Sequence, residues 1–397
     1  MATRSIQFPP TFSWGTSTSA YQIEGGGTNT DWWRFEHAPN TIAAEVCGDA
    51  CDSWHRYEED LDLLVQFGLN SFRLSVEWAR IEPERGTISI DALNHYRNVL
   101  EACHARSILP VVTLHHFTLP TWVADAGGFE NPEIVDWLAN YARVVGQELG
   151  ALIGIACTIN EPNIVAVMGY LLGFFPPQVS DNERFVAVNE MMRRAHVAMR
   201  EALREGPGDF PIGMPLSMQE YEALAGGEAL LEEMRDEMED KYLRAVDDDD
   251  YVGVQCYTKL LVGPDGVVFD PPGEKTEMGY LFWPQCVEHT VRRAASFTSK
   301  PIIVTENGIG TNDDEQRIRY LHAALQGLQR VLDDGIDVRG YFQWSLLDNF
   351  EWTLGYAPKF GIVSVDRTTF ARSPKPSAQW YAQATANFPA SVSGTLP

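Results

Sequence analysis

The fold is first indicated by two apolar runs, Ser71-Phe72-Arg73-Leu74-Ser75-Val76 and Leu109-Pro110-Val111-Val112-Thr113-Leu114. A helical pattern over Ile90–Arg106 separates these two runs. Both runs are short and largely apolar, which is typical of parallel strands that are buried on both faces. The order of strand, helix and strand predicts the repeating unit of an α/β fold.

The same alternation continues along the chain in both directions. Eight apolar runs are expected to be strands: Phe12–Ser17, Ser71–Val76, Leu109–Leu114, Gly154–Ile159, Pro211–Leu216, Tyr251–Gln255, Pro301–Thr305 and Val338–Trp344. Helical patterns fall between them, over Tyr57–Phe67, Ile90–Arg106, Pro132–Leu149, Arg184–Arg204, Glu228–Val246 and Asp313–Asp334. In the first of these, Leu61, Leu64, Val65 and Phe67 are expected to form the apolar face. Eight such units predict an α/β protein with a single (β/α)8 TIM barrel as one catalytic domain, residues 1–397.

Polar and aromatic residues follow the apolar runs where a barrel would carry its active site, at the C-terminal ends of the strands. They include Arg73 with Glu77 and Trp78, then His115-His116-Phe117, Asn160-Glu161-Pro162, Gln255-Cys256-Tyr257, Glu306-Asn307-Gly308, Gln343-Trp344-Ser345 and Asn349-Phe350-Glu351-Trp352. Helix caps and satisfied polar groups would explain one or two of these residues. A shared rim explains all of them, so we expect one active site there.

Two of these residues, Glu161 and Glu306, follow separate strands and form the kind of pair that breaks a glycosidic bond. One carboxyl must protonate the leaving oxygen, while the other attacks the anomeric carbon or activates a water. The acid is kept protonated by burial or nearby negative charge, and the second carboxylate is kept ionised by cations and hydrogen-bond donors.

Composition narrows the possible partners. The chain has 397 residues with 30 Lys and Arg against 55 Asp and Glu, a net charge of −25, which disfavours nucleic acid and anionic membranes. We find neither a signal peptide in residues 1–10 nor a membrane-spanning run, and therefore expect a cytoplasmic protein. The six cysteines lack a paired framework or zinc-site spacing, so we expect free thiols, no metal and no cofactor.

The chain resembles glycoside hydrolase family 1, the β-glucosidase family, from Phe8 to about Tyr381. Four motifs carry the resemblance, each at an expected strand end: Phe12-Ser13-Trp14-Gly15-Thr16-Ser17-Thr18-Ser19-Ala20-Tyr21-Gln22-Ile23-Glu24-Gly25, Thr158-Ile159-Asn160-Glu161-Pro162, Thr305-Glu306-Asn307-Gly308 and Trp344-Ser345-Leu346-Leu347-Asp348-Asn349-Phe350-Glu351-Trp352. The resemblance implies a retaining mechanism with Glu161 as acid/base and Glu306 as nucleophile. Arg73 and Tyr257 are expected to donate to Glu306 and keep it anionic.

The resemblance also implies a site for the non-reducing sugar. Gln22, His116, Asn160 and Glu351 match positions that bind sugar hydroxyls, and Trp344 and Trp352 match aromatic platforms. Tyr280 lies where the family places a platform for the leaving group. His115 should point the opposite way from His116 along a strand, so we expect it to be structural. Asn163 and Asn307 are also expected to have supporting or turn roles.

Several positions depart from the family pattern. Gln255 and Cys256 stand where Asn and Tyr are usual, and Phe117 replaces a common Trp. The segments around the fifth to seventh strands look shortened. We therefore expect a more open leaving-group side and a relaxed preference for the leaving group, with less than a thousandfold difference between long and short ones.

Three alternatives are less well supported by the sequence. A 6-phospho-β-glycosidase needs partners for a phosphate where this chain has Glu351, and a carboxylate repels phosphate. A non-catalytic sugar-binding relative would typically lack one of the two glutamates. A metal-dependent barrel hydrolase needs ligands after its first strand, where this chain has Ser13-Trp14-Gly15-Thr16. The sequence favours a β-D-glucosidase that acts on small β-linked sugars or on aryl and alkyl glycosides, with β-D-fucosides and β-D-galactosides as further substrates. The preferred sugar, the balance of hydrolysis and transfer, and the oligomeric state are left open.

Overall fold

Eight parallel strands close into a barrel in the computed structural model of the chain, which describes residues 11–393. Their order around the barrel is β1-β11-β10-β7-β5-β4-β3-β2. Their bounds are β1 Ser13–Ser17, β2 Ser71–Ser75, β3 Leu109–His115, β4 Ile155–Ile159, β5 Ile212–Ser217, β7 Tyr251–Cys256, β10 Ile302–Asn307 and β11 Val338–Trp344. All eight expected strands are confirmed, with ends that differ by at most two residues.

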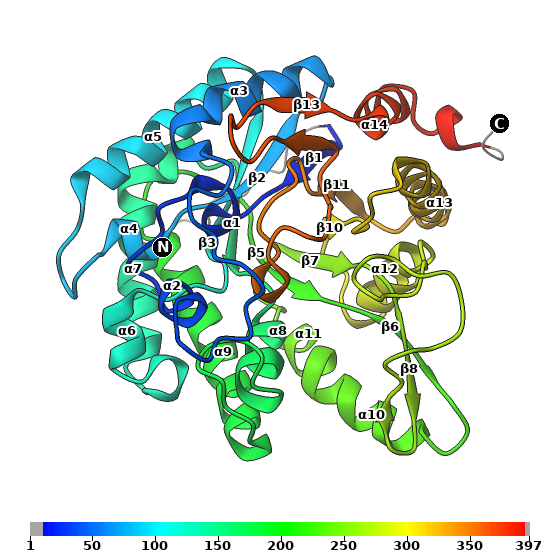
Figure 1. Ribbon diagram of the computed structural model, residues 1–397, viewed down its shortest axis with the longest axis horizontal. Coiled ribbons are helices and arrows are strands. Elements are labelled where there is room, and N and C mark those ends of the chain that lie inside the picture. The colour runs from blue at the N-terminus through cyan, green and yellow to red at the C-terminus, as the bar shows by residue number, and fades with distance from the viewer. Residues whose placement is uncertain (1–10, 394–397) are drawn as a thin grey trace.

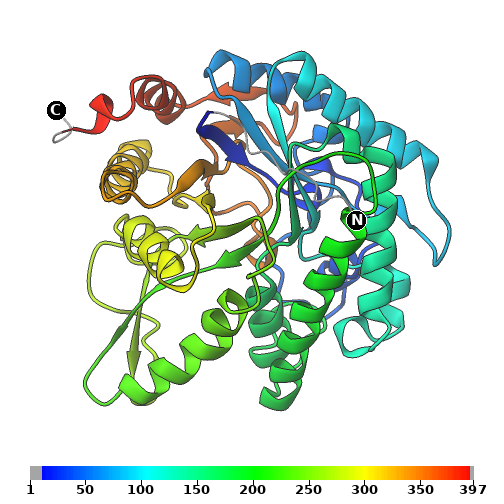
Figure 2. The same ribbon diagram turned by 180° about the vertical axis from the view of Figure 1, so that it is seen from behind.

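A ring of helices surrounds the barrel (Figures 1 and 2). The longer ones are α3 Ser53–Gln66, α5 Ile90–Ala105, α7 Ile134–Leu149, α9 Asn182–Leu203, α10 Glu228–Arg235, α12 Cys286–Phe297, α13 Asp314–Asp333 and α14 Pro376–Ala386. Shorter helices lie in the loops: α1 Ala20–Glu24, α2 Asp31–Glu36, α4 Trp78–Ile81, α6 Thr121–Asp125, α8 Pro162–Ala166 and α11 Lys241–Leu243. No helix within the described residues is both long and apolar enough to cross a membrane.

Two small sheets lie outside the barrel. One consists of β6 Glu220–Ala223, β8 Lys259–Gly263 and β9 Gly266–Val267, and the other of β12 Val363–Val365 and β13 Arg372–Pro374. Figure 1 shows β6, β8 and α10 together at the lower right, to one side of the barrel. Because β6 follows β5 and β8 follows β7, this sheet extends two of the loops that begin at strand ends.

The barrel interior is filled by side chains from different strands. One buried cluster joins Val111, Ile155, Cys157, Tyr251, Ile303 and Phe342, which point inward from β3, β4, β7, β10 and β11. A larger core lies between the strands and the helices. Because both faces of each strand are covered, the strands read as apolar runs in the sequence.

The sequence was a less accurate guide to the helices. The first long helix begins at Ser53 rather than Tyr57, and Val65 is 50% exposed, so its assignment to the apolar face is wrong. A single helix was expected over Glu228–Val246, but a π-helical turn at Asp236–Asp240 separates α10 from α11.

Helices α12 and α14 were not predicted. Their buried faces include small or polar residues such as Thr290, Ala294 and Ala378, which weaken an apolar periodicity. The six cysteines are all buried and free, as expected. Residues 1–10, and with them the start of the family resemblance at Phe8 and the search for a signal peptide, lie outside the described part of the chain.

Candidate active site

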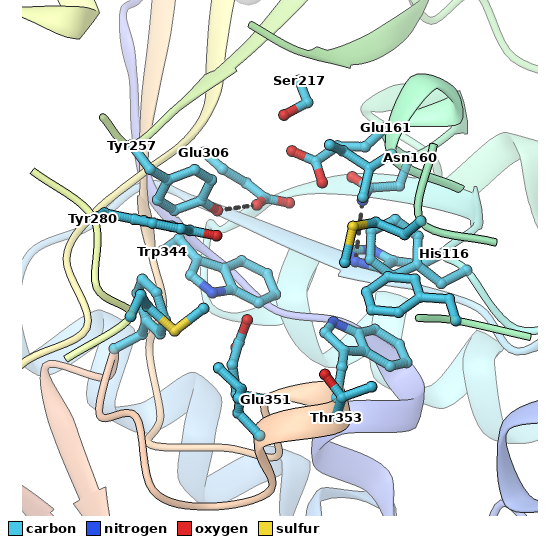
Figure 3. A pocket seen from close by; sticks show the side chains of 18 of the residues that line it. His116, Asn160, Glu161, Ser217, Tyr257, Tyr280, Glu306, Trp344, Glu351 and Thr353 are labelled. Carbon is cyan, nitrogen blue, oxygen red and sulfur yellow. Dashed lines mark hydrogen bonds between the residues drawn. The ribbon is translucent and has the colours of Figure 1, made fainter. Parts of the chain in front are cut away.

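A cavity of about 330 Å³ lies where the residues that follow the strands converge (Figure 3). Its volume is within the range that holds a small-molecule ligand. Glu161 comes from the start of α8, directly after β4, and Glu306 from the end of β10. The other polar or indole side chains that line it are His116, Asn160, Ser217, Gln219, Tyr257, Tyr280, Trp344, Glu351, Trp352 and Thr353.

The carboxylate of Glu306 accepts hydrogen bonds from three side chains. Arg73 Nη1 and Gln255 Nε2 both donate to its Oε1, the latter over 3.0 Å, and Tyr257 Oη donates to its Oε2. Arg73 Nη2 and Gln255 Nε2 also donate to Asn160 Oδ1, over 2.5 and 2.9 Å. Arg73, Glu306, Gln255 and Asn160 therefore form a closed ring of four hydrogen bonds. This ring fixes the orientation of both the carboxylate and the amide.

Glu161 has a different environment. Burial, and then the negative charge of Glu306, raises the pKa of Glu161 well above its usual range, with a hydrogen bond to Ser217 and the charge of Arg73 opposing the shift. Burial also raises the pKa of Glu306, but Arg73, Tyr257 and Gln255 all act to lower it. Glu306 is therefore the first of the two to ionise, and Glu161 keeps its proton longer. A protonated acid and a carboxylate in one cavity can carry out combined proton donation and nucleophilic attack.

Six of the residues predicted to bind substrate line the cavity: His116, Asn160, Trp344, Glu351, Trp352 and Tyr280. Burial lowers the pKa of His116 well below its usual range, so its imidazole is neutral, and the Asn160 amide donates to its Nε2 over 3.2 Å. Burial, followed by the charge of Glu306, raises the pKa of Glu351 to about 8. Figure 3 shows Glu351 on the opposite side of Trp344 from Glu306.

Gln22 does not line this cavity, although it was predicted to bind sugar. Its side chain is fully buried, and its Nε2 donates to the Phe350 carbonyl over 2.7 Å and to Asn349 Oδ1 over 3.2 Å. Ser19 donates to Gln22 Oε1 over 2.6 Å. In this arrangement Gln22 holds the segment that carries Glu351, and direct binding of a sugar stays a prediction.

Three non-glycine residues of the cavity wall have left-handed backbone conformations. These are Phe117 with φ of 71°, Glu161 with φ of 41° and Trp352 with φ of 49°. Such conformations cost of order 1–3 kcal/mol each and persist where the surrounding structure imposes them. Because three such residues lie around one cavity, the backbone is strained there. This strain fixes the directions in which their side chains point.

Two residues of the site were missed in the sequence. Gln255 was placed among the residues after the strands and noted as a departure from the family pattern, but it was given no role, yet it bonds to both Glu306 and Asn160. Ser217 ends β5, and its partnership with Glu161 had no motif to reveal it. A polar residue at the end of an apolar strand was the one available signal for both.

The residues expected to be structural have supporting positions. His115 is buried against Phe129, and burial lowers its pKa to about 3. Asn163 donates to the carbonyls of Ser217 and Met238 over 2.7 and 2.8 Å. Asn307 donates to the Cys256 carbonyl over 2.7 Å. Within residues 11–393, no group of three or more His, Cys, Asp or Glu side chains could hold a metal ion.

Comparisons with known proteins show which family and which structures the chain is similar to. The profile of Glycosyl hydrolase family 1 matches residues 4–253 and 232–388. Beta-glucosidase A of Acetivibrio thermocellus is 32% identical, with 96% of this chain and 99% of that protein covered. Coniferin beta-glucosidase of Pinus contorta is also 32% identical, with coverage of 95% and 91%. The crystal structure of beta-glycosidase BGL167 superposes with a TM-score of 0.90 at 39% identity, over 98% of this chain and 99% of that one.

Proposed function

The chain belongs to glycosyl hydrolase family 1 and is a glycoside hydrolase, and from that premise we propose that it hydrolyses terminal non-reducing β-D-glucosides. β-D-Galactosides and β-D-fucosides are proposed as further substrates, since a galactoside differs from a glucoside only in the configuration at C4, and a fucoside additionally lacks the 6-hydroxyl. The observation that carries the proposal is the contrast between the two carboxyls, one surrounded by donors and the other with its pKa raised.

The proposed reaction is a double displacement. In the first step Glu306 attacks the anomeric carbon while Glu161 transfers its proton to the leaving oxygen, and the glycosidic bond breaks. Esterification removes the charge of Glu306, so the pKa of Glu161 falls. In the second step Glu161 takes a proton from a water that attacks the same carbon, and Glu306 leaves as a carboxylate. Two inversions give net retention.

The remaining cavity residues support binding of the sugar in this reaction. Arg73 and Tyr257 are proposed to keep Glu306 ionised, and Asn160 to present its amide N–H to the substrate because its oxygen is already bonded to Arg73 and Gln255. The indoles of Trp344 and Trp352 offer apolar faces to the C–H side of a sugar. His116 and Glu351 offer hydrogen bonds to hydroxyls.

We propose that residues 1–397 act as one catalytic domain. Glu306 lies on β10, and its donors Arg73 and Gln255 lie on β2 and β7, so both halves of the sequence contribute to its environment. A fragment that lacked either half of the barrel would lose a contact to Glu306.

Hydrolysis of 6-phosphoglucosides is the nearest alternative. A charged Glu351 would repel a phosphate. This repulsion weakens near neutral pH, because the pKa of Glu351 is raised to about 8 and the carboxyl is then largely protonated. However, the side chains that line the cavity in the described part of the chain include neither Lys nor Arg. The site therefore offers no cation to a phosphate.

A side-by-side assay tests the proposal. We expect turnover of aryl β-D-glucoside, weaker turnover of the β-D-fucoside and β-D-galactoside, and none of the 6-phosphoglucoside. NMR of the first product should give the β-anomer. First release of the α-anomer would overturn the retaining mechanism, and preference for the phosphorylated substrate would overturn the proposed substrate. Activity should also survive treatment with a chelator.

A further inference from the structure

Strand β10 contributes to the active site from both of its faces. Glu306 lines the cavity, and the side chain of the next residue, Asn307, lies on the opposite face of the strand. There the Asn307 amide is 3.1 Å from the hydroxyl of Tyr320 on helix α13. Figure 1 shows α13 in the ring of helices, on the side of β10 and β11. A hydrogen-bond network outside the cavity therefore begins one residue from Glu306.

The register of β10 against β7 shifts by one residue just before Glu306, which then pairs with Gln255. Such a bulge changes the direction of a side chain and interrupts the ladder of backbone hydrogen bonds, and bulges are common next to active sites. Here the side chain of Asn307 reaches the neighbouring strand instead. Its Nδ2 donates to the Cys256 carbonyl over 2.7 Å, so the two strand ends stay joined beyond the bulge.

Tyr320 extends this network by one residue along the end of β7. Its hydroxyl donates to the Tyr257 carbonyl over 2.8 Å and accepts from Asn307 Nδ2 over 3.1 Å. Asn307 Oδ1 accepts from the Tyr341 hydroxyl over 2.7 Å. Asn307, Tyr320 and Tyr341 are fully buried. Both N–H groups of the amide and both hydroxyl hydrogens are used, so the network fixes the direction of each donor.

Tyr257 connects this network to Glu306. Its side-chain hydroxyl donates to Glu306 Oε2, and its backbone carbonyl accepts from Tyr320. Tyr257 lies one residue beyond the end of β7 at Cys256, so the pairing between strands does not extend to it. A hydrogen bond weakens steeply when donor and acceptor are misaligned. The contact of Tyr257 with Glu306 therefore depends on how firmly the backbone of Tyr257 is held.

We propose that Tyr320 is a positioning residue for Glu306. Its hydroxyl fixes the backbone of Tyr257, and the Tyr257 side chain therefore stays directed at the carboxylate. Tyr320 does not line the cavity, and it belongs to none of the four motifs that carry the family resemblance. The inference rests on the proposed function, because it adds a residue that supports the proposed nucleophile.

Several charged or titratable groups interact with Glu306 from different elements. They are Arg73 of β2, Tyr257 beyond β7, Glu161 at the start of α8 and Glu351 after β11. Removal of the Tyr320 hydroxyl leaves all of these groups in the chain. A change in the titration of Glu306 would therefore report the geometry of its donors.

Tyr320→Phe tests the proposal. The variant keeps the ring, which packs edge-on against Phe282, and loses only the hydroxyl. The Tyr257 hydroxyl acts to lower the pKa of Glu306, so the pKa should rise when Tyr257 is less well fixed. Since protonated Glu306 cannot attack, the acid limb of kcat/KM should move upward by roughly half a pH unit. At the optimum kcat/KM should fall by about five- to twentyfold. A native acid limb would overturn the inference.

Tyr381→Phe is the matched control. Tyr381 is fully buried on α14, and its hydroxyl donates to the Gly15 carbonyl of β1 over 3.0 Å. The control therefore loses the same kind of bond between a helix and a strand, at a residue that does not line the cavity. Thermal unfolding measures the stability that each variant loses, and Tyr381→Phe should keep the native acid limb. Equal shifts of the limb in the two variants would contradict a specific role of Tyr320.

A double variant identifies the route from Tyr320 to Glu306. Tyr257→Phe removes the hydroxyl that contacts Glu306 and should move the acid limb upward by roughly one unit. If Tyr320 acts through Tyr257, the addition of Tyr320→Phe should leave this limb in place and change kcat/KM by less than about twofold. Additive effects of the two substitutions would show that Tyr320 acts by another route and would refute the proposal.

The failure of this inference can be distinguished from the failure of the proposed function. If the native chain hydrolyses no β-D-glucoside, the proposed function is wrong and the inference falls with it. If the native chain is active and Tyr257→Phe moves the acid limb but Tyr320→Phe does not, the proposed function stands and only the role of Tyr320 is wrong.

Discussion

Glu306 and Glu161 face one cavity, but the two sides of that cavity are built differently. Glu306 ends a strand in the middle of the barrel and receives hydrogen bonds from Arg73, Gln255 and Tyr257. Glu161 begins a short helix in a left-handed conformation and has Ser217 as its hydrogen-bond partner.

The contrast shows how one residue type can serve opposite roles. Burial raises the pKa of both carboxyls, so burial alone cannot separate them. The separation comes from the donors, which are concentrated on Glu306. The charge of Glu306 then acts on Glu161 and raises the pKa of Glu161 further. One set of donors therefore sets the state of both groups.

The largest effect is expected when Glu306 loses its charge. Glu306→Gln keeps the size of the side chain but removes the nucleophile, so kcat should fall by at least roughly 10⁴-fold. Calorimetry with a sugar-like inhibitor should still detect binding, because the other contacts to sugar persist. Activity within about tenfold of the native chain would show that Glu306 is not the nucleophile.

A change at Glu161 should depend on the leaving group. Glu161→Gln should lower kcat/KM by roughly 10³-fold for alkyl glucosides, which need the proton. Dinitrophenyl β-D-glucoside needs little protonation, so its kcat/KM should fall by less than about tenfold.

The pH profile gives a second readout for the same variant. The raised pKa of Glu161 means that the proton donor is lost as pH rises through that pKa, so the native kcat/KM should fall on the alkaline side. Glu161→Gln should lack this alkaline limb. Equal losses for both leaving groups, or an unchanged limb, would assign the proton donor to another residue.

A smaller effect is expected from the ring of hydrogen bonds. Gln255→Met keeps the shape of the side chain but removes a donor to Glu306 and to Asn160, so kcat/KM should fall by about 10- to 100-fold. The pKa of Glu306 should rise, which moves the acid limb of the pH profile upward by roughly one unit.

Gln343→Met is the matched control for this change. Gln343 is a fully buried amide on β11 that bonds to the Trp344 carbonyl and does not line the cavity. Its variant can lose stability but should keep the native acid limb. If both variants moved the limb equally, the shift would be a general effect of lost packing.

The smallest effect is expected for Glu351, the third carboxyl that lines the cavity. Its Oε2 is buried without a hydrogen bond, and its pKa is raised to about 8. A carboxyl with a raised pKa favours folding while it is protonated, and this contribution is lost as pH rises from about 5 to 8. Glu351→Gln should therefore stabilise the protein by about 1–2 kcal/mol at pH 8.5 and by little at pH 5.

Thermal unfolding at the two pH values measures this difference. Glu232→Gln, on the exposed surface of α10, should change the stability by less than about 0.5 kcal/mol at either pH. An equal gain for Glu351→Gln at both pH values would show that its carboxyl does not titrate in this range.

Much of the fold could be predicted because strands buried on both faces leave a clear apolar signal. All eight strands were located, and many of the residues that follow them line one cavity. Glu77, Trp78 and Cys256, which were expected at the same site, do not line it. The helices were harder, since α12 buries Thr290 and Cys286, and α10 meets α11 through a π-helical turn. Gln22 was assigned from a motif, and the motif could not reveal that its amide is bonded to the Phe350 carbonyl.

The order of the strands and the reactive groups at their ends could be predicted from the amino-acid sequence, because these are local properties of short segments. The pairing of donors with each carboxyl became visible only in the folded chain. Arg73 is 233 residues from Glu306, and Gln255 is 95 residues from Asn160. Such partners meet only when the barrel closes, since closure and register fix which strand ends are neighbours. The roles of the two glutamates follow from that closure.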